Sequence, residues 1–403
     1  MMADHIPFVF GAEDCEILKR FYSDFTVVRI SLQTEDKTLK NLPAKPQLWV
    51  DAGVDGLHGW KAQRITKRGE ETKRYEAYDQ YIKGFPGHDR IANPDFQKTP
   101  QNNVVKQFVD SILDACCALS PKPAWLSIPQ LPMVSNPSRN TINRLLAQNT
   151  AEWKRSRKYN GKLILPVIFT DRKQVNLKTL GKGKLAEQCY ERAGAQGVWV
   201  VESTLNDQDG SGSLDKRFQG LVEFHQELAE SLPSEAIRVA GPYWGMNLVL
   251  WARGLIHHPA FGLGSAYQYH IPGFTPTTAS TRLAISPLRR LALAGPELRN
   301  WLDKSLATMP KGDNAYSDLG ALSRILAQGL ASAKTQAKIQ VAKFYRDWFD
   351  SLASVPLNGR ALALFQQLSS AYVLGKSLPD LPRDEGTARR PERVAQQLML
   401  NCL

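Results

Sequence analysis

The sequence predicts an α/β protein: a (β/α)8 barrel of the TIM type followed by an all-helical C-terminal domain. Short apolar runs with strand composition alternate with helical patterns, which is typical of parallel strands joined by right-handed crossovers. Eight such runs fall within about 260 residues, the usual size of this barrel. A doubly wound open sheet is the alternative. No GxGxxG or GxxxxGK[ST] pattern follows any of these runs, which weakens the nucleotide-binding forms of that alternative.

The expected elements follow from composition and periodicity. Two of the strands, Leu163–Phe169 and Gly197–Glu202, are apolar on both faces, as buried parallel strands tend to be. The other strands are expected at Pro7–Phe10, Thr26–Ile30, Leu48–Asp51, Ala124–Ile128, Ile237–Ala240 and Ala260–Leu263. Helices are expected at Ala12–Phe21, Asn102–Leu119, Pro137–Lys158, Lys184–Ala193, Leu214–Leu232 and Trp244–Ile256.

Two regions interrupt the alternation. Residues 60–101 form a charged and aromatic insertion after the third strand, and connections of this length are usually functional or disordered. The strand signal ends after Pro272, and the chain is expected to be helical from Pro287, with Ala321–Leu352 as the clearest helix. We therefore predict a barrel over 1–275 and a helical domain over 276–403.

The composition indicates a soluble, basic, cytoplasmic protein. Of its 403 residues 43% are hydrophobic and 22% charged, and the net charge is +12 with pI ≈ 9.4. No apolar run reaches the roughly 18 residues of a membrane span, and the N-terminal residues do not resemble a signal peptide. The five cysteines are scattered without CxxC spacing, which favours structural thiols over a metal or redox site. No cofactor and no metal are predicted.

Residues at the carboxyl ends of barrel strands are the candidates for catalysis, because active sites lie there. Asp51 ends the third strand and precedes Gly53, so it is a candidate nucleophile or general acid/base, although Asp also caps turns. Glu202 ends the sixth strand and is the second candidate carboxylate; an ion pair with a neighbouring loop is its alternative role. The predicted substrate-binding residues are Gly53, Gln130, Gly241, Tyr243, Trp244, Tyr267, Tyr269 and His270.

Three stretches concentrate basic residues: Lys61–Arg74, Trp153–Lys162 and Arg172–Lys184. Aromatic residues are interleaved with them, a combination suited to neutralising phosphates and stacking bases. Each stretch alone is typical of a solvated surface, but three on one face of a basic barrel predict nucleic-acid binding. The predicted contacts are Lys61, Arg64, Lys67, Arg68, Lys73, Arg74, Lys154, Arg155, Arg157 and Lys158.

The order of motifs over residues 45–270 resembles the tRNA-guanine transglycosylase superfamily, including its relatives that insert 7-deazaguanine bases into DNA. Asp51-Ala52-Gly53 resembles that family's D-S-G turn. His88 and Thr99-Pro100-Gln101 resemble its histidine loop and the helix start that follows. GVWVVES and RVAGPYWG resemble two of its later strands. The resemblance implies a barrel that exchanges a base in DNA or RNA through a covalent aspartate and a second aspartate that acts as acid/base.

The sequence also departs from this family. No Asp stands near Phe261-Gly262, where the covalent aspartate would fall, and no C-x-C-x-x-C zinc site is present. Either Glu202 takes the missing role, with Asp51 and Glu202 as the carboxylate pair, or the barrel is catalytically silent and binds nucleic acid or scaffolds a complex. The helical C-terminal domain would then contact the polyanion or a protein partner. A small-molecule hydrolase or aldolase is the third alternative.

Overall fold

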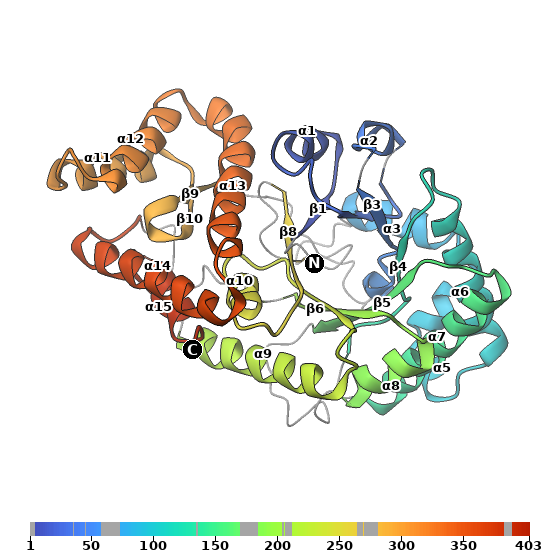
Figure 1. Cartoon of the computed structure of the whole chain (residues 1–403). Coiled ribbons are helices and arrows are strands. Elements are labelled where there is room, and N and C mark those ends of the chain that lie inside the picture. The colour runs from blue at the N-terminus through green and yellow to red at the C-terminus, as the bar shows by residue number, and fades with distance from the viewer. Residues whose placement is uncertain are drawn as a thin grey trace.

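Eight parallel strands close into a barrel at the centre of the computed structural model (Figure 1). The strands pair in sequence order, and β1 pairs with β8 to complete the ring. The (β/α)8 prediction is therefore confirmed. The strands are β1 (Ile6–Val9), β2 (Val27–Ser31), β3 (Gln47–Asp51), β4 (Trp125–Ser127), β5 (Lys162–Phe169), β6 (Gly197–Glu202), β7 (Ile237–Ala240) and β8 (His258–Gly262). The structure describes residues 5–34, 36–44, 46–57, 73–133, 136–169, 184–203, 205, 212–263, 269, 281–382 and 389–403.

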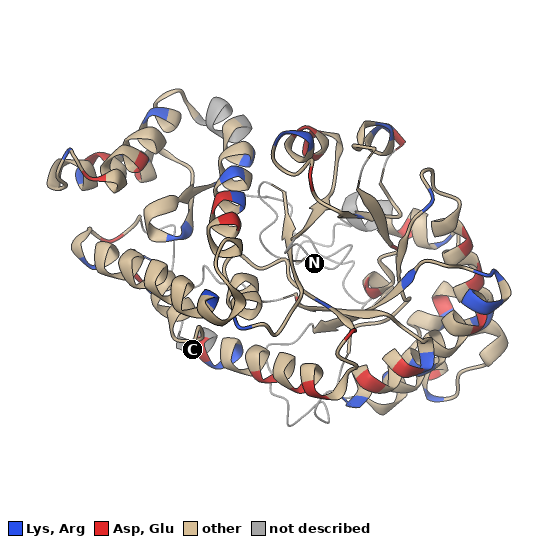
Figure 2. Ribbon diagram, in the orientation of Figure 1, with Lys and Arg blue, Asp and Glu red and all other residues tan. Residues whose placement is uncertain are grey.

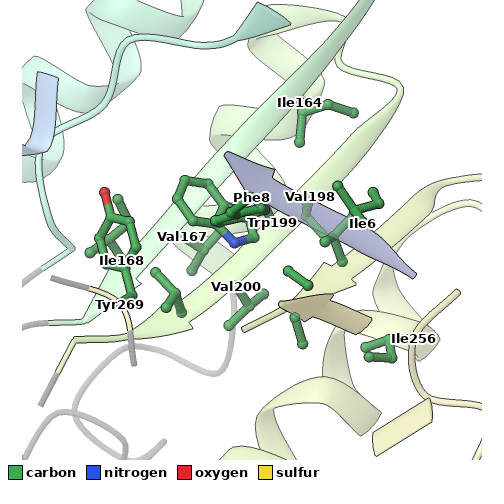
Figure 3. Packing of buried hydrophobic residues seen from close by; sticks show 14 of the residues in the cluster. Ile6, Phe8, Ile164, Val167, Ile168, Val198, Trp199, Val200, Ile256 and Tyr269 are labelled. Carbon is green, nitrogen blue, oxygen red and sulfur yellow. The ribbon is translucent and has the colours of Figure 1, made fainter. Parts of the chain in front are cut away.

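The barrel interior is filled by a layer of large aromatic side chains. The rings of Phe8, Trp49 and Trp199 lie 5.5–5.9 Å apart, centroid to centroid, although they come from β1, β3 and β6, which do not pair with one another. Rings from non-adjacent strands can meet in this way only inside the barrel. Figure 3 shows Phe8 and Trp199 in contact within this core, with Tyr269 to one side of them. The layer fixes which residues of each strand face inward, since side chains alternate along a strand.

Helices surround the barrel on its outer face. They are α1 (Ala12–Phe21), α2 (Asp36–Asn41), α6 (Asn102–Cys117), α7 (Pro137–Ser156), α8 (Lys184–Ala193), α9 (Gly212–Ser231) and α10 (Met246–Ala252). The insertion after β3 contributes η1 (Val54–Leu57), α3 (Lys73–Ile82), α4 (His88–Ala92) and α5 (Pro94–Lys98). None of the helices in the described part of the chain is both long and apolar enough to cross a bilayer. None of the five cysteines forms a disulfide bond.

A helix from the C-terminal region occupies the place of the eighth barrel helix. This helix, α13 (Leu330–Ala353), lies between α1 and α10 (Figure 1). Tyr22, which follows the end of α1, donates a hydrogen bond from its hydroxyl to the Ala342 carbonyl at 2.7 Å. The Tyr345 ring stacks on Phe261 of β8 at 3.8 Å, and Phe349 stacks on Trp251 of α10 at 4.5 Å. The outer layer of the barrel is thus completed by residues about 70 positions beyond β8, in the helix starting at Leu330.

The C-terminal region is mainly helical, as predicted, but it also holds a hairpin that the sequence prediction omitted. Strands β9 (Arg282–Ile285) and β10 (Arg290–Leu293) pair antiparallel around η3 (Ser286–Leu288). A second, smaller core around Leu302 and Leu319 joins this hairpin to the helices. The remaining helices are α11 (Pro296–Thr308), α12 (Asn314–Ala327), α14 (Leu357–Ser377) and α15 (Arg393–Met399).

The prediction of a single helix over Ala321–Leu352 is wrong. The helix is interrupted between α12 and α13 at Gly329. The φ of this residue, +92°, lies in a region that residues with a side chain rarely adopt. The apolar periodicity continues across this break because both helices bury one face, α12 in the smaller core and α13 against the barrel. A prediction based on periodicity alone therefore merges the two helices into one.

His5 lies at the start of β1 inside a nest of rings that includes Tyr22, Phe25, Tyr345 and Phe349, with centroids 4.4–5.3 Å away. Neither of its ring nitrogens has a hydrogen-bond partner within the described residues. Burial, and then the nearby Arg346 guanidinium, lower the pKa of His5 well below its usual 6.5. The structure therefore holds this imidazole in its neutral form.

We expect this burial to make the protein acid-sensitive. The unfolded chain protonates His5 below about pH 6.5 and the folded chain does not, so stability is intact above that pH and is lost as pH falls below it. His5→Phe removes the titration, so urea denaturation at pH 5.5 should show a smaller loss relative to pH 7.5, by up to about 1.4 kcal/mol. Burial also lowers the pKa of His225, to about 3, which leaves a residual dependence in the variant. An unchanged pH dependence in the variant would contradict the prediction.

Candidate active site at the carboxyl end of the barrel

Asp51 points into the barrel, at its carboxyl end. It lies two residues after Trp49 on β3, and Trp49 belongs to the interior aromatic layer, so strand alternation turns Asp51 inward as well. Its carboxylate forms an ion pair with Arg29 of β2. Both side chains are nearly buried, at 5% exposure for Arg29 and 8% for Asp51. The sequence-predicted candidate thus lies at the expected mouth, already paired with a cation.

Glu202 points the other way, and the structure does not bring it together with Asp51. It lies three residues after Trp199 on β6, so alternation turns it outward through the barrel wall. There it forms an ion pair with Arg217 of α9. Phe169, its register neighbour on β5, packs in the same direction against Phe224 of α9. The expected carboxylate pair of Asp51 and Glu202 is therefore corrected, and Glu202 has the ion-pair role that was its alternative.

The structure supplies a different partner for Asp51, one that sequence reasoning missed. Asp55 lies in η1, four residues after Asp51, and is 2% exposed. Burial and the nearby Asp51 charge raise the pKa of Asp55 to about 7, against the lowering effects of Tyr269 and Arg29. A buried pair of this kind holds one proton and one negative charge near neutral pH. The D-x-x-x-D spacing at a predicted strand end was the available signal.

Tyr269 reaches the same site from the segment after β8. Its hydroxyl donates a hydrogen bond to Asp55 Oδ2 at 2.8 Å. Its ring lies edge-on to Trp199 at 5.2 Å and 5.9 Å from the Arg29 guanidinium. The other residues predicted for this segment, Tyr267 and His270, lie outside the described residues. Tyr269 is therefore placed where a pocket-lining residue was expected.

The insertion anchors the turn that carries both aspartates. Tyr78 and Tyr81 of α3 donate hydrogen bonds from their hydroxyls to the carbonyls of Gly53, at 2.9 Å, and Ala52, at 2.7 Å. Gly53 has a φ of +65°, which favours glycine. A side chain at position 56 would not fit, because a Cβ on Gly56 would lie 2.5 Å from the Tyr78 ring. The small residues of the Asp51–Gly56 segment are thus required by the tight turn and by the packed tyrosine.

Beside the two aspartates, side chains of β3, β4 and β5 pack closely around a narrow gap that has no room for a water-sized molecule. Ser127 and Gln130 line it with the apolar groups of Pro166 and Ile168. The Gln130 Nε2 donates to the Asn143 carbonyl at 3.0 Å, which fixes the amide orientation. Gln130 Oε1 is buried and has no hydrogen-bond partner in the described part of the chain. Gln130 Oε1 is therefore a fixed, buried acceptor at the edge of this gap.

Two further predicted substrate residues do not reach this mouth. Tyr243 is buried, and its hydroxyl accepts a hydrogen bond from the backbone N–H of Glu202 at 2.7 Å. Trp244 is buried against Phe344 of α13, at 5.8 Å, and donates from Nε1 to the Arg289 carbonyl at 2.9 Å. Neither ring has a free face for a base, so both assignments are corrected. Gly241 accepts a hydrogen bond from Trp199 Nε1 on its carbonyl, at 2.6 Å.

The basic residues of the Trp153–Lys162 stretch do not lie at the mouth with Asp51. Lys154, Arg155, Arg157 and Lys158 lie at the end of α7 and in the turn before β5, the amino-terminal end of the barrel and opposite to Asp51. Arg157 is engaged by Asp114 through two hydrogen bonds of 2.7 and 2.9 Å. Lys61, Arg64, Lys67 and Arg68 lie outside the described residues, and so do the side chains of Lys73 and Arg74 in α3.

The C-terminal region does not present an unopposed basic face on α13. Figure 2 shows basic and acidic residues side by side on this helix. Lys338 pairs with Glu13 of α1, and Lys343 pairs with Asp347. Within the described residues, no group of three or more His, Cys, Asp or Glu side chains is arranged to hold a metal ion.

The sequence matches no protein-family model and no curated protein. The resemblance to the tRNA-guanine transglycosylases therefore stays a prediction.

We predict that Tyr269 controls the proton on Asp55. Its hydroxyl stabilises the ionised carboxylate, so Tyr269→Phe should raise the pKa of Asp55 by roughly one unit, since a hydrogen bond to a charged group contributes about 1.5 kcal/mol. Titration of the aspartate side-chain carbons by ¹³C NMR measures it. Tyr81→Phe is the matched control, because it removes a neighbouring hydroxyl that bonds to Ala52 and not to Asp55. A fall in the Asp55 pKa, or equal effects of the two variants, would refute the assignment.

Proposed function

We propose that this protein is a (β/α)8-barrel enzyme that breaks or exchanges the N-glycosidic bond of a nucleobase in DNA or RNA. The observation that carries the proposal is the buried pair of Asp51 and Asp55 at the carboxyl end of the barrel. Their surroundings favour charge on one and a proton on the other, which is the division of labour that glycosidic cleavage requires. Asp55 takes the role that the sequence prediction gave to Glu202.

The two aspartates divide the reaction between them. An Asp51 oxygen forms a bond to the anomeric carbon of the sugar as the bond from that carbon to the base nitrogen breaks. Asp55 gives its proton to the departing nitrogen, so that the base leaves neutral. An incoming base or water then loses a proton to Asp55 and attacks the same carbon, which releases Asp51. Arg29 compensates the negative charge of Asp51 before and after these steps.

Recognition of the base is proposed for Gln130, beside the pair, where the surrounding side chains have to move apart to admit a heterocycle, because the gap there is too narrow for a water-sized molecule. The unfilled Gln130 oxygen is an acceptor for an N–H group on the edge of a heterocycle. Such a base has to leave the helical stack to reach a barrel mouth. The support for a polyanionic substrate lies in the sequence. The segments 58–72 and 170–183, which follow β3 and β5, hold eight basic and three acidic residues.

A catalytically silent barrel that binds nucleic acid is the second candidate. The observation in its favour is that the gap beside the pair has no room even for a water-sized molecule, whereas pockets for small molecules usually have about 300–1,000 Å³. In this case the Arg29–Asp51 pair has only a structural role. Activity measurements on variants of the pair decide between the two candidates.

We expect Asp55→Asn to lower base release or base exchange on an oligonucleotide by about 10²–10⁴-fold at pH 7, the usual contribution of a general acid. In the unmodified protein the rate should fall above about pH 7, because Asp55 loses its proton there. Asp51→Asn should abolish turnover. Glu202→Gln is the control, since it alters a buried carboxylate outside the barrel and should retain activity. Equal activity of all three variants would remove the aspartate pair from the mechanism, and no base release by the unmodified protein would leave the silent barrel as the function.

Binding of the polymer should depend on salt and on the stretch that follows β3. We expect the combined Lys61→Gln, Lys67→Gln and Arg68→Gln variant to reduce the slope of log K against log salt by about 2–3, at roughly 0.9 per phosphate contact on a duplex. The combined Lys154→Gln, Arg155→Gln and Lys158→Gln variant removes the same charge from the opposite end and should leave the slope unchanged. Fluorescence anisotropy of a labelled oligonucleotide measures both. A flat salt response would exclude the nucleic-acid substrate.

A further inference from the structure

Arg29 is a charged side chain in the interior of the barrel, and the aspartate pair depends on it. The residue comes from β2, and its guanidinium lies between the aromatic layer and the mouth. Its central carbon is 4.3 Å from the centroid of Phe8 and 4.5 Å from that of Trp199. Trp49 and Tyr269 lie at 5.9 Å. Four rings therefore surround the cation.

The guanidinium forms a hydrogen bond with one of the two aspartates. Its Nη2 pairs with Asp51 Oδ2, and its Nε has no partner within the described residues. A buried guanidinium keeps its proton, and aromatic faces attract its charge without accepting strong hydrogen bonds. Asp51 is then the anion that compensates it. The cage thus selects which of the two aspartates carries the negative charge.

The remaining titratable groups around the pair do not compete with Arg29 for this role. Tyr78 and Tyr81 from α3, Tyr269 from the segment after β8 and Cys116 from α6 all act electrostatically on the pair or are acted on by it. Burial raises the pKa of each, so all four are uncharged near neutral pH. Within the described residues, Arg29 is therefore the cation at this site.

We propose that Arg29 is the positioning residue of this site: held in its aromatic cage, it keeps the charge on Asp51 and thereby leaves the exchangeable proton on Asp55. This assignment rests on the proposed function for its catalytic meaning, but the protonation order is a property of the folded protein alone. An arginine suits the role because its planar, weakly hydrated guanidinium stacks on rings, whereas a lysine ammonium is a strongly hydrated point charge.

The protein offers a matched control. Arg217 and Glu202 form a second buried ion pair, at 8% and 1% exposure, which faces outward between β6 and α9. Removing either arginine leaves one buried carboxylate without its guanidinium. Only the loss of Arg29 removes the cation from the aspartate pair. Arg29→Met and Arg217→Met therefore separate a general loss of stability from the proposed positioning role.

The experiment titrates the aspartate side-chain carbons by ¹³C NMR in the full-length protein, with a pH profile of turnover beside it. In Arg29→Met we expect Asp51 to take up a proton at least one pH unit higher than in the unmodified protein, which is a tenfold or greater change in proton affinity. The acidic limb of the kcat profile should move up by the same amount. Arg217→Met should leave both unchanged. An unchanged Asp51 titration in Arg29→Met, or equal shifts in the two variants, would overturn the proposal.

Arg29→Lys provides a second variant if the methionine variant does not fold. It retains a positive charge but loses the planar group that fits the cage, so we expect an upward shift of the Asp51 titration, smaller than for methionine. A titration equal to that of the unmodified protein would overturn the role given to the cage. If no substrate is turned over, the NMR titrations still decide the protonation order, so a failure of the proposed function is distinguishable from a failure of this proposal.

Discussion

The ion pair between Arg29 and Asp51 is the interaction on which the mouth of this barrel depends. Taking two charges out of water is costly, and their attraction compensates the cost only where the geometry is good and other groups assist. Here the assistance comes from rings of four different segments, which approach the guanidinium within 6 Å. The interior aromatic layer is therefore both the barrel core and the surface on which the charge rests. Any change in that layer reaches Asp51 through Arg29.

The barrel in turn depends on chain that lies far beyond its last strand. The outer face of β8 carries Phe261, and its ring is covered by Tyr345 of α13. The same helix buries His5 at the start of β1. The seam where β1 and β8 close the ring is thus sealed by α13. The C-terminal region is consequently part of the barrel as well as a lobe with a core of its own.

The sequence was sufficient to predict the barrel, since eight apolar runs and the patterns between them have strong periodicity and little competition. It was also sufficient to place Asp51 at the carboxyl end of a strand, because the end of an apolar run marks the end of the strand. The direction of Glu202 was not predictable, because GVWVV is apolar on both faces and does not reveal that Trp199 faces inward. The predictions for Tyr243 and Trp244 failed for a related reason: Tyr243 is bonded to the backbone of β6 and Trp244 is buried against α13, and single-sequence patterns do not show such tertiary contacts. The position of Asp55 beside Asp51 could not be predicted, because it depends on the turn at Gly53, which the hydrogen bond from Tyr78 holds in place.

The two buried ion pairs show why position decides function here. Arg217–Glu202 and Arg29–Asp51 have the same chemistry and similar burial, yet they lie on opposite sides of the barrel wall. The outward pair lies between a strand and a helix, where it joins β6 to α9. The inward pair has a second carboxylate beside it, and two negative charges cannot both be accommodated next to one cation in a buried site. That excess of one carboxylate over one guanidinium keeps a proton at the barrel mouth. In the proposed function, this is the proton that Asp55 gives to the substrate.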